Sequence, residues 1–295
     1  MTTPPRSAGT ELGILCADRS ERGKLALTGP QRAWFLHQVV TQAFEDITPG
    51  EARDAAMITA HGRMTGYCEA LATEDAVLCH FESELIGVFE ETLRRYVFAT
   101  QVDIADVTSA RGLVLVAGSG WREIGGIVAP EASQHRTTSL GVEAGYLWLE
   151  GTGVQDVMAA LEDSGAKVAG EADLEHIRIS NGVARWGREM NTKAFPQEVG
   201  IEGNAIHYDK GCYLGQEAMA KIHFRGKVNR KLVRVVADAP LSVGAEVSEE
   251  GQKVGSVTSA SNGIGLALVR HTVAPGAEVS AGGVPARIEA PAPYS

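Results

Sequence analysis

An octapeptide in the last third of the chain, Lys210 to Glu217, constrains the local structure more than any other stretch. It reads Lys-Gly-Cys-Tyr-Leu-Gly-Gln-Glu, with Cys212 between two glycines. Gly211 and Gly215 allow backbone conformations and close approaches that a side chain would block. A helical pattern follows from Gln216 to Phe224, and Glu217 in its first turn complements the exposed N–H groups. The octapeptide therefore predicts a tight loop that leads into a helix.

Cys212 in this loop is the candidate functional thiol. It lies close to a helix N-terminus and to Lys210, and both settings favour the thiolate form of a cysteine. The alternative is that Cys212 is a small buried hydrophobic residue, the commoner role of a lone cysteine. The stretch differs from the G-x-S-x-G nucleophile elbow because the cysteine directly follows the first glycine. This difference weakens a hydrolase interpretation.

The octapeptide is similar to the signature of the YgfZ/GcvT-like folate-binding family, which is related to the glycine-cleavage aminomethyltransferase. Other segments match the pattern of that family in order along the chain. These are 25–30 with Phe35, Leu36, His37 and Thr41, then 178–182, 196–198 and 229–232. The resemblance extends from about residue 12 to about residue 270.

This resemblance implies an α+β fold with three domains in a ring around a central channel that receives a reduced folate. We expect a discontinuous folate-binding domain from residues 1–50 plus 171–228, which carries the octapeptide. A ferredoxin-like α+β domain would span 51–170, and a small β-barrel would span 229–295. Independently of the resemblance, short β-rich runs separated by Gly and Pro from residue 228 onward are typical of a barrel or sandwich.

The resemblance also implies a set of folate contacts, with tetrahydrofolate or a derivative as the cofactor and no metal. Glu198 would accept the paired N–H donors of the pterin ring, as a carboxylate can. Trp186 is a candidate stacking platform, although an ordinary core position is the alternative. Arg230 would meet the folate or its tail. The remaining candidates of this set are Lys210, Tyr213, Gln216 and Arg225.

A short basic window lies just after the octapeptide in an otherwise acidic chain. It contains Lys221, Arg225, Lys227, Arg230, Lys231 and Arg234. One interpretation is a solvated linker to the barrel. The other is an anion site near the thiol, which would suit a folate polyglutamate tail or a local tRNA or phosphate contact.

One position departs from the pattern of the aminomethyltransferases. Many relatives place an aspartate after the hairpin that contains Gly62 and Arg63, and counting from there puts Tyr67 in that slot. The next acidic residue is Glu69. A tyrosine stays protonated at neutral pH and cannot replace a carboxylate in moving a proton or stabilising an amine cation. We therefore do not expect glycine-cleavage activity, and whether the chain is an enzyme stays open.

Composition narrows the classes of partner. The chain has 295 residues, a net charge of −10 and a pI near 5.3, which argues against general nucleic-acid binding. Four cysteines at positions 16, 68, 79 and 212 form no C-x-x-C or zinc spacing and suit a reducing compartment. The first nine residues hold no apolar core typical of a signal peptide, and no apolar run reaches membrane length. These features predict a cytoplasmic protein with no membrane partner.

Three functions are compatible with the sequence. The leading hypothesis is a folate-binding accessory protein in iron–sulfur protein assembly or repair, with Cys212 as the functional thiol and iron–sulfur client proteins as partners. Such a protein could also affect tRNA-thiolating enzymes. The alternative is a tetrahydrofolate-dependent aminomethyl or methyl transferase, or a demethylase. A cysteine hydrolase is the third, although neither His207 nor His223 has a diagnostic spacing to Cys212.

Overall fold

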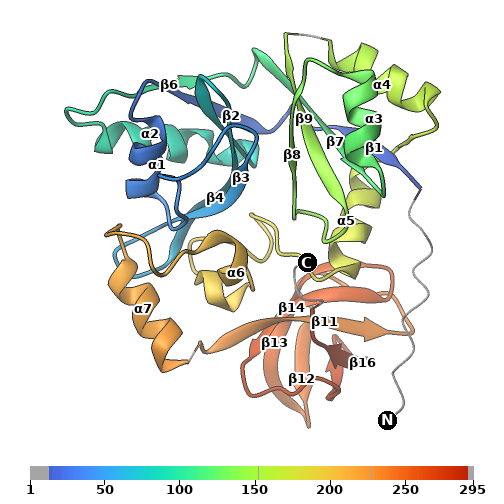
Figure 1. The fold of residues 1–295 in the computed structure, drawn as a ribbon. Coiled ribbons are helices and arrows are strands. Elements are labelled where there is room, and N and C mark those ends of the chain that lie inside the picture. Colours follow the sequence, from blue (N-terminus) through green and yellow to red (C-terminus); the bar gives the residue numbers. More distant parts are fainter. Residues whose placement is uncertain (1–12, 152, 227, 292–295) are drawn as a thin grey trace, which may run out of the picture.

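The computed structural model describes residues 13–151, 153–226 and 228–291. Three sheets organise these residues, and Figure 1 shows one at the upper left, one at the upper right and a barrel at the bottom. Helices and strands are mixed along the chain, which confirms the predicted α+β class with a C-terminal β-barrel.

The first sheet has the strand order β3-β4-β5-β2-β6 and is antiparallel throughout. Helix α1 and the pair η1 and α2 cover one of its faces. The strands are β2 (Gly23–Thr28), β3 (Ala52–Ile58), β4 (Met64–Ala72), β5 (Ala76–Phe81) and β6 (Asp103–Asp106). The helices are α1 (Arg32–Val39), η1 (Ser83–Leu85) and α2 (Ile86–Tyr96). The bounds of β3 and β4 match the hairpin expected around Gly62 and Arg63.

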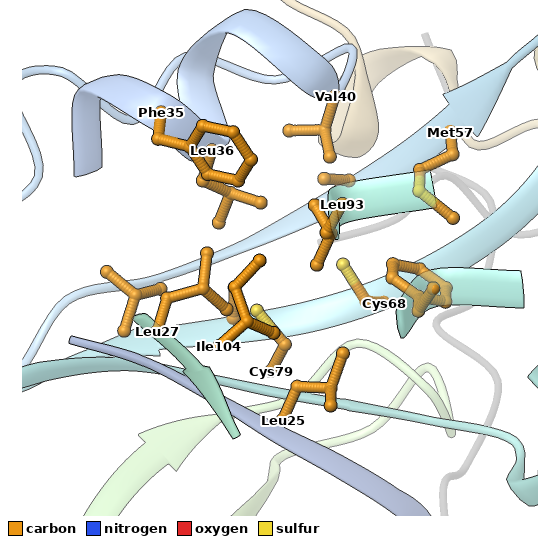
Figure 2. Packing of buried hydrophobic residues seen from close by; sticks show 14 of the residues in the cluster. Leu25, Leu27, Phe35, Leu36, Val40, Met57, Cys68, Cys79, Leu93 and Ile104 are labelled. Atoms are coloured by element: carbon orange, nitrogen blue, oxygen red, sulfur yellow. The ribbon is translucent and has the colours of Figure 1, made fainter. Parts of the chain in front are cut away.

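Figure 2 shows the core between these helices and the first sheet. Leu25 and Leu27 of β2 point toward the helices, as do Cys68 of β4 and Cys79 of β5. This follows from the period of two in a strand, which sends alternate side chains to one face. Each large apolar side chain buried here contributes about 1.5–3 kcal/mol. Cys68 and Cys79 are therefore residues of this core.

The second sheet has the order β10-β1-β7-β9-β8, and its strands are antiparallel except for the β1–β10 pair. Helices α3 and α4 pack on its outer face. The strands are β1 (Leu15–Asp18), β7 (Arg111–Ala117), β8 (Ser133–Arg136), β9 (Ala144–Glu150) and β10 (Lys167–Val168). The helices are α3 (Trp121–Val128) and α4 (Val154–Asp163).

The two sheets pack against each other through the faces that their helices leave free. Ala26, Leu71 and Leu78 of the first sheet meet Leu115 and Trp148 of the second in one buried cluster. The order of layers is therefore helix, sheet, sheet, helix. Side chains at inward positions of both sheets face one another, and this places the polar groups described below.

The C-terminal sheet closes into a barrel with the order β11-β14-β13-β12-β15-β16. Closure removes the exposed edges that an open sheet would present. Its strands are β11 (Arg230–Ala237), β12 (Glu246–Glu249), β13 (Gln252–Ser261), β14 (Ile264–Arg270), β15 (Glu278–Ala281) and β16 (Val284–Glu289). Valine, alanine and isoleucine side chains from all six strands fill the interior.

The segment between the second sheet and the barrel fills the centre of the molecule. It contains α5 (Glu171–Ser180), η2 (Pro196–Glu198), α6 (Glu202–Ala205) and α7 (Gln216–Arg225). Its apolar side chains pack against Ile58 and Met64 of the β3–β4 hairpin and against Leu266 of the barrel. Figure 1 shows α6 in the middle and α7 at the lower left.

The sheets group the strands differently from the predicted domain limits. Strand β2, which precedes residue 50, pairs with β5 and β6, which follow it. Strand β1 belongs to the other sheet. The division into 1–50 plus 171–228 and 51–170 stays a prediction about domains, whereas hydrogen bonding groups β2 with β3–β6 and β1 with β7–β10.

Gly215 of the octapeptide is required where the loop meets the β3–β4 hairpin. It has a φ of 83°, and a Cβ atom there would lie 2.4 Å from the carbonyl oxygen of Thr59. Gly211 does not use the conformational freedom that a glycine allows. A Cβ atom at Gly211 would meet no heavy atom of the described residues within 4 Å, and its φ is not positive.

We expect Gly215→Ala to lower the free energy of unfolding by about 1–3 kcal/mol, the cost of a left-handed conformation at a non-glycine residue. Gly211→Ala is the matched control in the same loop and should change it by less than about 0.5 kcal/mol. Urea unfolding of both variants measures the difference. Equal effects would mean that the contact with Thr59 does not constrain the loop.

Candidate functional site

A cavity of about 680 Å³, part of it open to solvent, lies between the two sheets and the central segment. Tyr67 and Glu69 of β4 contribute to its wall, as do Tyr146 of β9 and Leu140. Trp186 and Ile201 close it from the central segment. Tyr67 and Glu69 are two residues apart on one strand, so both project to the face that meets the second sheet. We call this space the central cavity.

A set of arginine and glutamate side chains, which we call the arginine–glutamate network, borders the central cavity. Its members are Arg22, Glu82, Glu171, Glu175, Arg178, Arg185 and Glu189. Arg185 pairs with Glu82 through Nε at 3.0 Å and with Glu175 through Nη1 at 3.0 Å, and it also contacts Glu171. Arg185 thereby joins α5 to the chain after β5.

The same network reaches the barrel through Arg178. Its guanidinium donates to Glu175 of α5 at 2.7 Å, to Glu189 at 2.9 Å and to Ser259 of β13 at 2.8 Å. At the other end, Arg22 pairs with Glu82 at 2.8 Å. Burial raises the pKa of Glu82, but Arg22 and Arg185 lower it by more, so that the pKa is about 2. Glu82 is thus a paired anion at neutral pH.

A row of polar side chains crosses the inward face of the first sheet. Asp54 of β3 is opposite Glu69 of β4, and Glu69 is opposite His80 of β5. Two carboxyl groups directly opposite each other destabilise their charged forms. Burial, followed by the nearby Glu69, raises the pKa of Asp54 to about 7, although Thr138 donates a hydrogen bond to it at 2.7 Å.

Glu69 differs from the other cavity carboxylates in its partners. Glu82 and Glu175 are held by arginines, whereas the buried Oε2 of Glu69 has no hydrogen-bond partner within the described protein. A buried acceptor without a donor is costly, so such an atom calls for an explanation. Glu69 is the carboxylate of the central cavity with an acceptor atom to offer to a ligand.

Trp186 and Tyr67 are the sequence-predicted residues that the structure brings together with Glu69. Trp186 is half-buried and packs against the cores on both sides of it. It lines the central cavity together with Tyr67. An indole face at a cavity wall is available for stacking on a flat ring. The sequence-based alternatives for Trp186, core residue and platform, are therefore compatible with each other.

Glu198 and Arg230 lie together, but outside the wall of the central cavity. Glu198 is 3% exposed, and Arg230 binds its two oxygens through Nε at 3.1 Å and Nη2 at 2.9 Å. Oε2 also accepts from the N–H of Phe195 at 3.1 Å. The carboxylate expected to hold the pterin edge is thus engaged by Arg230, and its contact with folate stays a prediction.

Lys210 stabilises the C-terminal end of α1. Its buried Nζ donates to the carbonyl oxygens of His37, Val40 at 2.6 Å and Gln42 at 2.9 Å, at and just beyond the C-terminus of α1. Burial lowers the pKa of Lys210 to about 7. All three hydrogen bonds of Nζ go to carbonyl oxygens of residues about 170 positions earlier in the chain.

Tyr213 and Gln216 pack around this lysine. Nζ of Lys210 lies 4.8 Å from the centre of the Tyr213 ring, and Gln216 donates to the Lys210 carbonyl at 3.3 Å. Burial raises the pKa of Tyr213 to about 12. In this structure both side chains support the loop, and their proposed contacts with folate are untested.

Cys212 is exposed on the surface just before α7, whereas Cys16, Cys68 and Cys79 are buried. The alternative of a buried hydrophobic cysteine is therefore wrong for Cys212. A hydrogen bond with Cys79 and burial raise the pKa of Cys68 well above its ordinary value. Cys212 is not among the residues that line the central cavity, so the thiol and the cavity are separate features.

The basic window is partly neutralised by local acids. Arg230 pairs with Glu198, Arg234 with Glu289 at 3.4 Å and Lys221 with Glu217 at 3.5 Å. The side chain of Arg225 and the whole of Lys227 lie outside the described residues. The anion-site interpretation consequently rests on fewer free cations than the sequence suggested.

Sequence reasoning missed the histidine pair His80 and His135 and all of the arginine–glutamate network. Glu69 was noted only as the acid nearest to Tyr67. The available signal was an ionisable residue inside an apolar strand, as in Cys68-Glu69-Ala70 and Cys79-His80-Phe81. The pairing itself could not be foreseen because His135 comes from the other sheet.

The arrangement of the whole chain matches the aminomethyltransferase fold. The glycine-cleavage aminomethyltransferase T of Bartonella henselae superposes with a TM-score of 0.84 at 16% identity, over 97% of this chain and 89% of that one. Residues 229–293 match the family described as CAF17, C-terminal beta-barrel domain. The three-domain fold class predicted from the sequence is confirmed.

Sequence relatives agree with this fold. A chloroplastic protein of Arabidopsis thaliana is 28% identical over 85% of this chain, and the tRNA-modifying protein YgfZ of Klebsiella pneumoniae is 23% identical over 78%. The mitochondrial iron-sulfur cluster assembly factor IBA57 of mouse is 36% identical over 23%. The chain is thus similar to proteins of the YgfZ/GcvT-like family along most of its length. It spans 62% of the plant protein, 74% of YgfZ and 21% of IBA57.

No helix among the described residues is both long and apolar enough to span a bilayer.

We expect Lys210→Met to lower the free energy of unfolding by about 1–3 kcal/mol, because the carbonyls at the end of α1 lose their buried donor. Lys221→Met is the control, since its ammonium is exposed and pairs with Glu217 in the same helix. Urea unfolding at pH 7 distinguishes them. Unchanged stability of Lys210→Met would mean that water satisfies those carbonyls equally well.

The raised pKa of Asp54 predicts a pH-dependent stability difference. Between its ordinary value of 3.8 and about 7, the unfolded chain has lost the proton that the folded chain retains. The wild type should therefore lose stability relative to Asp54→Asn as pH rises through this range, with no further loss above it. Urea unfolding from pH 4 to pH 8 tests this, with the exposed Asp75→Asn as control. A constant difference would contradict the assignment.

Proposed function

We propose that this chain is a tetrahydrofolate-binding accessory protein that acts in iron–sulfur protein assembly or repair. The observation that carries the proposal is the central cavity, where Trp186 offers a stacking face and Glu69 an unpartnered carboxylate oxygen. The fold shared with an aminomethyltransferase and the similarity to YgfZ and IBA57 support it.

The chemistry of a reduced pterin matches these two groups. The ring is flat and carries N–H donors along one edge, so it can stack on an indole while its donors meet a carboxylate. Glu69 can accept such donors without giving up a partner. Glu198, the carboxylate predicted from the family pattern, would first have to release Arg230 or bind together with it. Both carboxylates are therefore tested below.

Cys212 serves a partner protein in this proposal. Its side chain is exposed and lies apart from the lining of the central cavity, so it is accessible to a docking protein while folate occupies the cavity. Iron–sulfur client proteins are the expected partners. Three of the cysteines are buried, which leaves Cys212 as the thiol that can meet a cluster or a client.

A one-carbon transferase is the second candidate, and the position of Glu69 favours it. Tyr67 occupies the expected acid slot, but Glu69 lies two residues further on the same face and reaches the same cavity. Glu69 could thus take the acid–base role that Tyr67 cannot fill. Folate-dependent turnover of a methylamine donor by the wild type, abolished in Glu69→Gln, would establish this second function.

The primary test is an anaerobic calorimetric titration of tetrahydrofolate into the wild type and four variants, one of which is Glu198→Gln. We expect stoichiometric binding by the wild type and an affinity reduced about tenfold or more in Trp186→Ala and Glu69→Gln, because each loses a direct contact. Glu150→Gln is the control, since this exposed carboxylate pairs with Arg111 and does not line the central cavity.

Each alternative outcome is informative. Loss of binding in Glu198→Gln with unchanged binding in Glu69→Gln would place the pterin at Glu198 and overturn the role given to Glu69. Absence of binding by the wild type would overturn the folate proposal as a whole.

A further inference from the structure

Three buried side chains from both sheets converge beside the central cavity. Glu69 of β4, His80 of β5 and His135 of β8 are each at most 2% exposed. Oε2 of Glu69 lies 3.9 Å from Nε2 of His80 and 3.7 Å from Nε2 of His135. The two Nε2 atoms are 3.3 Å apart. One small group can therefore touch all three atoms.

Two histidines and a carboxylate resemble a set of metal ligands. Whether these residues can bind a metal ion depends on Nδ1 of each histidine ring, the nitrogen that points away from Glu69. Nε of Arg22 donates to Nδ1 of His80 at 3.0 Å, and Nε1 of Trp148 donates to Nδ1 of His135 at 3.3 Å. Arginine and tryptophan nitrogens are donors only, so each Nδ1 must be an acceptor without a proton.

This assignment determines the protonation of Nε2, the nitrogen of each ring that faces Glu69. A neutral imidazole has one N–H, and a ring whose Nδ1 accepts must carry its proton on Nε2. Burial and the neighbouring Arg22 lower the pKa of His80 well below its ordinary value, which keeps this ring neutral. Both Nε2–H groups thus point inward as donors.

A metal ion would require the opposite tautomers. A ligating histidine offers a bare nitrogen to the metal and usually donates its other N–H to a carboxylate, carbonyl or water. Here the outer nitrogens face donors, so metal binding through Nε2 would set two N–H groups against Arg22 and Trp148. The positions of the three side chains resemble a metal site, but the nitrogens that would bind the metal carry protons.

We propose that Glu69, His80 and His135 form a hydrogen-bonding site for one protic oxygen, a water molecule or a ligand hydroxyl group, and not a metal site. The two Nε2–H groups donate to the lone pairs of this oxygen. Its own O–H donates to Oε2 of Glu69, the buried acceptor that has no donor within the described protein. Both Nε2–H donors and the Oε2 acceptor then have a partner.

This hydrogen-bonding site also has a role in folate binding, which rests on the proposed function. His80 and His135 are positioning residues, because they act on the ligand through Glu69. They hold an oxygen on one side of its carboxylate while the central cavity lies on the other. Glu69 is thereby kept oriented as an acceptor toward the N–H edge of the folate.

The first test reads the tautomers directly in the wild type and needs neither folate nor a variant that might misfold. Long-range ¹H–¹⁵N NMR spectra of ¹⁵N-histidine-labelled protein at pH 7 should show His80 and His135 as neutral rings protonated on Nε2. A ring protonated on Nδ1, or on both nitrogens, would overturn the proposal.

The second test uses the metal itself. Co²⁺ is titrated into the wild type, Glu69→Gln and Glu150→Gln, and binding is followed by the visible absorption of the bound ion. We expect the three spectra to coincide, because any bound Co²⁺ would lie elsewhere. One equivalent of Co²⁺ bound by the wild type and Glu150→Gln, but not by Glu69→Gln, would overturn the proposal.

These outcomes are independent of the folate titration. If the wild type does not bind folate, the tautomers assigned to His80 and His135 can still be correct. If the tautomers differ from those assigned, folate can still bind, but the positioning role of the two histidines is wrong.

Discussion

The arginine–glutamate network is the interaction that holds α5 between the first sheet and the barrel. Arg178 of α5 contacts Glu189 and also Ser259 of the barrel, while Arg185 joins α5 to the chain after β5. Removing one partner of a buried ion pair costs about 3–5 kcal/mol, because the remaining charge is left uncompensated. The network therefore fixes how α5 meets the first sheet and the barrel, beside the central cavity that it borders.

The same pairing leaves one carboxylate of the cavity distinct from the others. Glu82 and Glu175 are held by arginines, whereas Glu69 faces Asp54, two histidines and the cavity. Its position results from strand register, since Asp54, Glu69 and His80 are directly opposite one another across three strands. The exposed thiol of Cys212 belongs to a different surface. A chain with this design can bind a small molecule inside and meet a protein partner outside.

Local features of this architecture were predictable from the sequence because they depend on short-range rules. The period-two pattern, the hairpin around Gly62 and the β-rich third domain all follow from nearby residues. The carbonyl partners of Lys210 could not be predicted because they lie at the end of α1, far away in sequence. His80 and His135 were missed for the same reason, since only the packing of two sheets brings them together. The family signature predicted the fold but could not show that Arg230 already binds Glu198.

The most direct measurement of the central claim is a crystal structure of the chain grown anaerobically with tetrahydrofolate. We expect the pterin ring against the indole of Trp186, with its N–H edge about 3 Å from the Glu69 carboxylate. We also expect Arg230 to remain paired with Glu198. A pterin bound at Glu198 with Arg230 displaced, or a folate bound outside the central cavity, would contradict the account.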